Sequence, residues 1–172
     1  VYFEPWVAAS VMQEGLVALM AVKSGFKTSL TMQTPETLTF NLSGKGTYAE
    51  PYLIKTPADL MTLSQTSQKN SFKNKYFRLE NDIDMAGGTG YLPIGTAKAA
   101  FAGHFNGNGN TIKNLTLDGI AYNYQGLFGV MYEGSSVKNL KMTDVRITAN
   151  GYFIGAVAGY SMGEIDNCSM SG

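Results

Sequence analysis

One six-residue pattern recurs in the second half of the chain and limits what the chain can fold into. The pattern consists of an aliphatic residue, a charged residue, Asn, an apolar residue, a polar residue and a further apolar residue. It occurs at 112–117, 137–142 and 165–170, so its starts lie 25 and 28 residues apart. A repeat of about 20–50 residues indicates stacked supersecondary units that share one core.

Each unit has the pattern of short β-strands separated by turns rich in Gly and Asn, and no helical periodicity is visible after residue 76. The units therefore predict a mainly β protein, a right-handed parallel β-helix (β-solenoid) in which one unit makes one coil. Equivalent residues are expected to stack inside: Ile112, Val137 and Ile165 in one column, and Leu115, Leu140 and Cys168 in the next.

The N-terminal end of such a solenoid exposes apolar side chains and strand edges, so it needs a cover. A short strand is predicted at Tyr52–Ile54, followed by a helix start. Thr56 can cap the helix, Pro57 suits its first position, and Asp59 favours its positive end. We expect a capping helix of about three turns from Pro57.

The first part of the chain has a different texture. A short strand at 1–6, a helix at 7–22 and a β-hairpin around 30–42 are expected, with a boundary at 43–46. We therefore divide the chain into a β-rich and helical segment, 1–45, and a β-helix domain, 46–172. Because Val1 is not a start residue and Gly172 ends inside a repeat, we expect a fragment of a longer protein.

Composition narrows the class of function. Charged residues make up 15% of the chain, and 13 basic residues balance 13 acidic ones. A nucleic-acid-binding protein needs a basic patch, which is missing here. The apolar run at 7–22 is too short to span a bilayer. We expect no nucleic-acid partner, no membrane insertion within this fragment, no cofactor and, with one Cys, no internal disulfide.

An ordered set of motifs resembles the GLUG-repeat surface proteins of Gram-negative gut bacteria. The motifs are 46–54 (GTYAEPYLI), 58–60 (ADL), 76–85 (YFRLENDIDM), 93–95 (PIG), 101–112 (FAGHFNGNGNTI) and 126–129 (GLFG). Residues 155–159 (GAVAG) are similar to a second, degenerate GLUG unit. The Trp expected before Pro93 is absent, with Tyr91 and Leu92 in its place.

The resemblance implies a β-helix that is secreted or displayed at the bacterial outer-membrane surface and acts in cell adhesion. Its partner would be a glycan or protein of a host or bacterial surface. Residues 1–45 are similar, more loosely, to the end of a fimbrillin-type β-sandwich. The same repeats also occur as accessory regions in IgA-cleaving metallopeptidases, so the parent protein can carry an enzyme elsewhere.

Asn114, Asn139 and Asn167 share one place in the six-residue pattern. Asn tolerates the left-handed backbone that solenoid corners need, and its amide can bond to the amide of the next coil, at a spacing of about 4.8 Å. We predict that the three residues form a structural ladder.

Tyrosines recur at the spacing of the later units. Tyr124 and Tyr152 lie 28 residues apart, as do Tyr132 and Tyr160. Each pair is expected to stack on one face, where aromatic rows either stabilise the sheet or bind a ligand. These four tyrosines are the candidate ligand-binding residues.

Catalytic and metal sites are weakly indicated. Asp82 and Asp84 alternate with apolar residues and are calcium candidates without an evident third ligand. A triad would have to use His104, the single His. We expect no enzyme and favour an adhesion or binding module. The alternatives are a structural spacer in a surface assembly and a carbohydrate-active, lyase-like β-helix, which would need a basic cluster beside acidic calcium ligands.

Overall fold

The computed structural model describes residues 40–118 and 123–172, and the compact unit that they form begins at Phe40. The expected strand at 1–6 and helix at 7–22, and most of the hairpin around 30–42, lie outside the described residues. One helix, α1 (Pro57–Thr66), and thirteen strands are present in the described part. None of its helical residues form a segment long and apolar enough to cross a bilayer.

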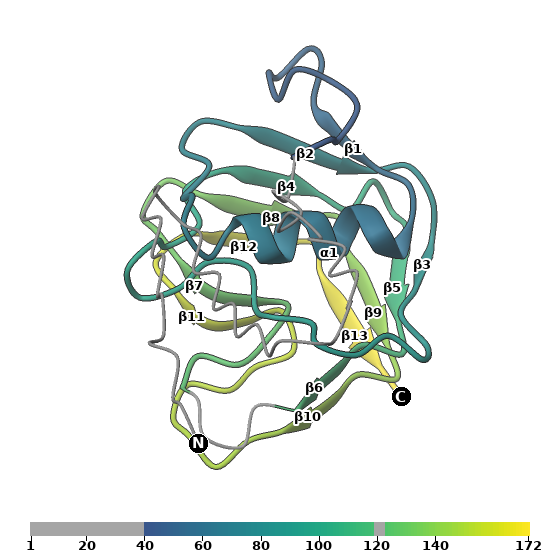
Figure 1. Ribbon diagram of the computed structural model, residues 1–172, viewed down its shortest axis with the longest axis vertical. Coiled ribbons are helices and arrows are strands. Elements are labelled where there is room, and N and C mark those ends of the chain that lie inside the picture. The colour runs from purple at the N-terminus through teal and green to yellow at the C-terminus, as the bar shows by residue number, and fades with distance from the viewer. Residues whose placement is uncertain (1–39, 119–122) are drawn as a thin grey trace, which may run out of the picture. The chain divides into compact units, whose positions relative to one another are not determined.

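The strands form four rows, which we call A to D (Figure 1). Row A holds β1 (Tyr52–Ile54), β2 (Tyr76–Leu79), β4 (His104–Asn106), β8 (Ser136–Lys138) and β12 (Glu164–Asp166). Row B holds β3 (Ile83–Asp84), β5 (Thr111–Lys113), β9 (Lys141–Thr143) and β13 (Ser169–Ser171). Row C holds β7 (Phe128–Met131) and β11 (Ala158–Ser161), and row D holds β6 (Thr116–Asp118) and β10 (Arg146–Thr148).

Every pairing within these rows is parallel. From β4 onward the chain passes through rows A, B, D and C before it returns to row A, one coil further on (Figure 1). The predicted parallel β-helix is therefore confirmed. Parallel pairing follows because each coil travels in the same direction as the coil on which it stacks.

The interior is filled by columns of apolar side chains, one column for each row. In row A, Phe77 pairs with Phe105 and Phe105 with Val137, and all three are buried. Row B continues the core with Ile112 and Met142, which pair with each other. Burial of each such side chain contributes about 1.5–3 kcal/mol, so stacking the coils supplies most of the stability.

The columns differ from those that the six-residue pattern predicts. Ile112 pairs with Met142, whereas Val137 pairs with Ile165. Leu115 is buried, but at a different corner from Leu140 and Cys168. The expected columns of Ile112 on Val137 and of Leu115 on Leu140 are therefore wrong.

The reason is that the pattern occurs at two different corners of the coils. At 137–142 and 165–170 it spans the corner from row A to row B, but at 112–117 it spans the next corner, from row B to row D. Residues 142–147 (MTDVRI) resemble it at the second corner, with Thr143 in place of the charged residue and Asp144 in place of Asn. The corner residues all have positive φ: Asn114, Asn139, Asp144 and Asn167.

Helix α1 covers the first coils, as predicted. Thr56 and Asp59 form a reciprocal capping box, and Pro57 occupies the first helical position. Leu60 and Leu63 are fully buried, because they face the interior of the coils. In Figure 1 the helix crosses the opening that the four rows enclose.

The last coil is more open than the others. Ile165 pairs in register with Val137 as expected, yet it is 43% exposed, whereas Val137 is buried. Met170 stands in the same relation to buried Met142. The difference arises because β12 and β13 are the terminal strands of rows A and B within the described residues.

Candidate binding surface

Three aromatic rings from two successive coils form a cluster at row C. Tyr124 and Phe153 lie just before its strands β7 and β11, in segments that we call the entrance to row C, and Tyr160 lies in β11. Tyr124 stacks on Phe153, with ring centroids 5.0 Å apart and planes 7° from parallel. Tyr160 packs edge-on against both rings, at 6.3 Å from Tyr124 and 5.6 Å from Phe153. Phe153 is 50% exposed and Tyr160 is 41% exposed, so the cluster presents apolar surface to solvent. We call these three residues the aromatic cluster.

The backbone of the cluster is strained. Tyr124 has φ of 61° and Phe153 has φ of 63°, a left-handed conformation that bulky residues rarely adopt and that costs about 1–2 kcal/mol each. Coil-to-coil bonds hold it, from Tyr124 N–H to the Tyr152 carbonyl and from Gln125 N–H to that of Phe153. Strain of this kind, held by its surroundings, is common at functional sites.

Two glycines make room for this arrangement. A Cβ at Gly159 would lie 2.5 Å from the carbonyl oxygen of Phe153 and 2.7 Å from the carbonyl carbon of Tyr124. A Cβ at Gly129 would lie 2.5 Å from the carbonyl oxygen of Gly95. The second glycine of each GLUG-like motif therefore lets neighbouring backbone approach row C closely.

The predicted tyrosine pairs are wrong. Tyr124 stacks on Phe153 and not on Tyr152, which is 77% exposed and lies outside the cluster. Tyr160 pairs with Val130 in row C and not with Tyr132. Both errors arise from applying one spacing of 28 residues to segments whose register differs.

The sequence did hold a signal for Phe153. Tyr124 and Phe153 each lie two residues before the first glycine of a GLUG-like motif, Gly126 or Gly155. The second motif is one residue longer than the first, so the register changes by one residue within row C. Aligning the motifs by their first glycine would have placed the two rings together.

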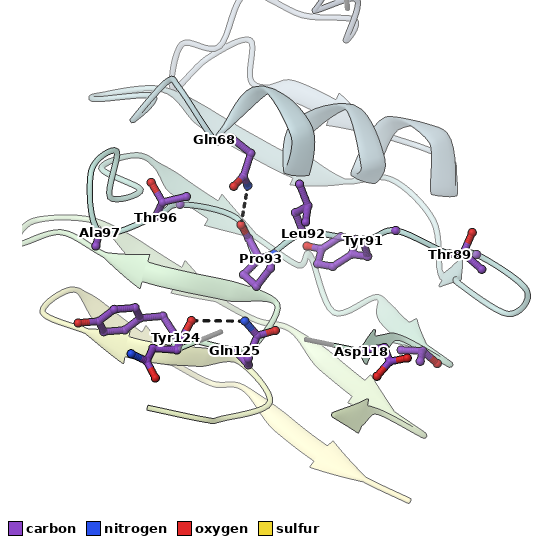
Figure 2. A pocket seen from close by; sticks show the side chains of 15 residues that line it. Gln68, Thr89, Tyr91, Leu92, Pro93, Thr96, Ala97, Asp118, Tyr124 and Gln125 are labelled. Atoms are coloured by element: carbon purple, nitrogen blue, oxygen red, sulfur yellow. Dashed lines mark hydrogen bonds between the residues drawn. The ribbon is translucent and has the colours of Figure 1, made fainter. Parts of the chain in front are cut away.

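A cavity of about 530 Å³ adjoins Tyr124 (Figure 2). One side comes from the segment 88–97 and the other from residues on β6 and at 123–125. Figure 2 shows Tyr91 and Pro93 across the cavity from Gln125, with Asp118 and Tyr124 toward opposite ends.

The cavity wall is held in place by Ser64 in helix α1, by Gln68 just after that helix, and by Leu127 just before β7. Ser64 accepts a hydrogen bond from the backbone N–H of Leu92, and Gln68 donates one to the carbonyl of Pro93. Tyr91 is buried and its hydroxyl donates to the carbonyl of Leu127 over 3.1 Å. Burial raises the pKa of Tyr91 well above its ordinary value, so the phenol stays protonated.

The cavity lining is mostly apolar and nearly uncharged, with a few hydroxyl and amide groups set into it. Of the described residues that line it, Asp118 alone carries a charge, and hydroxyls and amides supply the other polar groups. These groups are Gln68, Thr89, Thr96, Thr116, Asn123 and Gln125. The aromatic cluster and the cavity together make an apolar platform beside a recess that carries a few hydrogen-bonding groups.

The asparagine ladder exists, but with a different membership. The Asn167 amide donates to Asn139 over 2.8 Å, and the Asn139 amide donates to Asn106 over 3.2 Å. Asn114 lies at the next corner, where its amide donates to Asp84 over 2.8 Å. The prediction that Asn114 belongs to the same ladder is wrong, because its copy of the pattern marks another corner.

The two calcium candidates serve different contacts. Asp82 accepts a hydrogen bond from the N–H of Thr111 in the next coil. Asp84 accepts from the Asn114 amide and the N–H of Ala86, and the first of these is the main cause that lowers the pKa of Asp84. Across residues 40–118 and 123–172, no three His, Cys, Asp or Glu side chains gather as a metal site would require.

His104 lies on the outer side of row A. Its ring stacks on Tyr76 at 4.6 Å, and Nδ1 lies 2.9 Å from the Ser136 hydroxyl. Arg78 is paired with Glu80 over 2.7 Å. Cys168 is half-buried against the core, with its sulfur 3.3 Å from the carbonyl oxygen of Asp166.

Two relatives of known name are similar in sequence. A protein of Evansella cellulosilytica, named as a Gly-rich membrane protein, is 40% identical over an alignment 135 residues long, which covers 74% of this chain and 15% of that protein. Halomucin of Haloquadratum walsbyi is 32% identical over an alignment 180 residues long, gaps included, which covers 99% of this chain and 2% of halomucin. This chain therefore spans a small part of the length of both relatives.

One solved structure shares the fold. A Bacteroides ovatus protein named as an immunoglobulin A1 protease superposes with a TM-score of 0.64 at 25% identity, over 75% of this chain and 40% of that one. No family model matches the sequence.

Proposed function

We propose that this chain is a non-enzymatic binding module of a protein displayed at the cell surface, and that the aromatic cluster contacts a glycan or protein ligand. The observation that carries the proposal is the cluster itself. Two strained residues, Tyr124 and Phe153, hold stacked rings at the surface, although a polar residue there would be less costly to expose.

The names of the relatives support the location. One is called a membrane protein and the other a halomucin, and a membrane or mucin-type protein is consistent with surface display of this segment. We extend the proposal to secretion or outer-membrane display and to membership of the GLUG-repeat adhesins, on the resemblance of the ordered motifs at 46–129.

We assign no catalytic reaction to the described residues. His104 is engaged with Tyr76 and Ser136, and Arg78 with Glu80, so these side chains already serve the outer surface of row A. The parent protein can carry catalytic domains outside this segment.

A binding assay with matched variants tests the function. Beads coated with the chain are applied to glycan arrays and to whole cells, and Phe153→Ala is compared with Tyr132→Ala. Tyr132 is 52% exposed but lies outside the cluster. Loss of an aromatic anchor typically costs about 2 kcal/mol, roughly thirtyfold in affinity. Phe153→Ala should show that loss and Tyr132→Ala should not, with both variants folded by circular dichroism.

A structural spacer is the second candidate, and the regular stacking of the coils favours it. A spacer needs no exposed ring, so adhesion of the parent protein would survive Phe153→Ala unchanged. Full binding by that variant would contradict the module and support the spacer.

A further inference from the structure

The cavity beside the aromatic cluster has the dimensions and position of a ligand recess. Its volume of about 530 Å³ falls within the range of about 300–1,000 Å³ that is usual for small-molecule sites. Tyr124 belongs both to the cavity lining and to the cluster. A ligand that stacks on the cluster can therefore extend into the recess.

The lining combines a mostly apolar surface with a few polar groups. Thr89, Thr96 and Thr116 offer groups that can donate and accept, and Asn123 and Gln125 offer amides. Sugars carry apolar C–H faces together with hydroxyls that donate and accept, so they match both parts of such a lining. The Asp118 carboxylate can accept from two neighbouring hydroxyls at once, and such charge-assisted bonds are the stronger ones.

The charge of the lining decides between classes of saccharide. A uronate or sialate carboxylate is normally recognised by Arg or Lys, and the described lining residues include neither. An anionic sugar in the recess would instead meet the like charge of Asp118. Neutral sugars escape that repulsion and retain the hydrogen bonds.

We propose that the recess binds a neutral saccharide unit, with Asp118 and Thr116 as hydrogen-bonding residues and the aromatic cluster as the stacking platform for the adjoining unit. This inference rests on the proposed binding function and names its ligand class. Because the ligand is uncharged, its affinity should depend little on salt.

Calorimetric titration of the whole chain tests the proposal. The probes are neutral tri- and tetrasaccharides of glucose, mannose, galactose and N-acetylglucosamine, with trigalacturonate and sialyllactose as anionic counterparts, at low and high salt. At least one neutral probe should bind, and each anionic probe at least about tenfold more weakly. Asp118→Asn should weaken neutral binding about tenfold, the value of one charge-assisted hydrogen bond. Asp166→Asn, an exposed carboxylate in row A, is the matched control and should have no effect.

A second readout needs no variant. On titration with the neutral probe, the NMR amide signals of Thr89 and Thr96 should shift, because both residues line the recess. Signals of β12, in row A, should stay in place.

The outcomes separate the two proposals. Suppose that Phe153→Ala abolishes saccharide binding, that Asp118→Asn leaves the affinity unchanged, and that the Thr89 and Thr96 signals do not shift. The saccharide then binds at the aromatic cluster and not in the recess. If no neutral saccharide binds at about 1 mM but a protein ligand depends on Phe153, the saccharide inference is overturned and the binding module stands. If no ligand depends on either residue, both proposals fail.

Discussion

The corner between rows A and B and the entrance to row C belong to the same coils but are built differently. At the corner, Asn139 and Asn167 superpose and bond through their amides, and a buried or half-buried residue follows each. At the entrance to row C, Tyr124 and Phe153 superpose although the motifs that follow differ in length by one residue. Two residues separate the strands of rows A and B in these two coils, whereas four residues, 107–110, separate β4 from β5 in the preceding coil.

This difference separates scaffold from recognition. The corner supplies stability through its amide bonds and through the buried or half-buried residue that follows each Asn, whereas a surface segment can vary in residue type without opening the interior. The strained aromatic residues Tyr124 and Phe153 therefore lie in the surface segments before row C, whereas the amide ladder lies at the corner between rows A and B.

The largest effect is expected where row C meets its neighbours. Gly129→Ala should destabilise the fold by about 3 kcal/mol, because its Cβ would lie 2.5 Å from the Gly95 carbonyl oxygen, between two rigid coils. Gly134→Ala is the matched control, since Gly134 has φ of 80° but open space around it, and should lose only about 1 kcal/mol to backbone strain. Urea denaturation measures both, and equal losses would show that close approach at row C is unimportant.

The amide ladder should give the next largest effect. Asn139→Ala removes two coil-to-coil bonds and puts Ala at φ of 54°, so a loss of about 1–3 kcal/mol is expected. Asn167→Ala removes one ladder bond and should lose less. Asn139→Gly removes the same amide but adopts a φ of 54° without strain, so its loss of stability measures the contribution of the ladder bonds alone. Chemical denaturation of the three variants is the measurement, and an unchanged midpoint for Asn139→Gly would eliminate the ladder as a stabilising element.

The smallest effect concerns the corner that Asn114 occupies. The Asn114 amide, followed by the Ala86 N–H, lowers the pKa of Asp84 below its ordinary value of 3.8. A carboxyl with a lowered pKa stabilises the fold at pH values above its unfolded pKa, and this contribution disappears as the pH falls through the folded pKa. Asn114→Ala should raise the pKa of Asp84 toward 3.8 and flatten that acid dependence. An NMR titration of the Asp84 carboxyl carbon in the parent protein and the variant measures this change. Identical titration curves would contradict the role of Asn114 in lowering the pKa of Asp84.

Much of the fold was predictable because its signals are local. Thr56 and Asp59 form a capping box within four residues, Pro57 occupies the first helical position, and the structure places α1 there. Alternating apolar residues in short runs with Gly and Asn turns predicted parallel coils, and those coils are present. Each signal depends on neighbours in sequence, where the geometry is the same in every protein.

The register was not predictable from the six-residue pattern. Ile112 and Val137 share one local pattern but lie at different corners, because both corners need a left-handed residue followed by an apolar one. A pattern that marks two kinds of corner cannot say which corners stack, and the neighbours of Asn114 were misassigned for that reason. The tyrosines were misassigned because the spacing between equivalent residues changes from one row to the next.

The residue types that corners, caps and turns require could be read along the chain, since they follow from the conformation of a few consecutive residues. Which side chains meet across coils, such as Tyr124 with Phe153, depends on how many residues each coil inserts between rows. One added residue in the second GLUG-like motif shifts every later contact in row C. The aromatic cluster and its recess exist because coils nearly thirty residues apart come to lie one strand spacing from each other, about 4.8 Å.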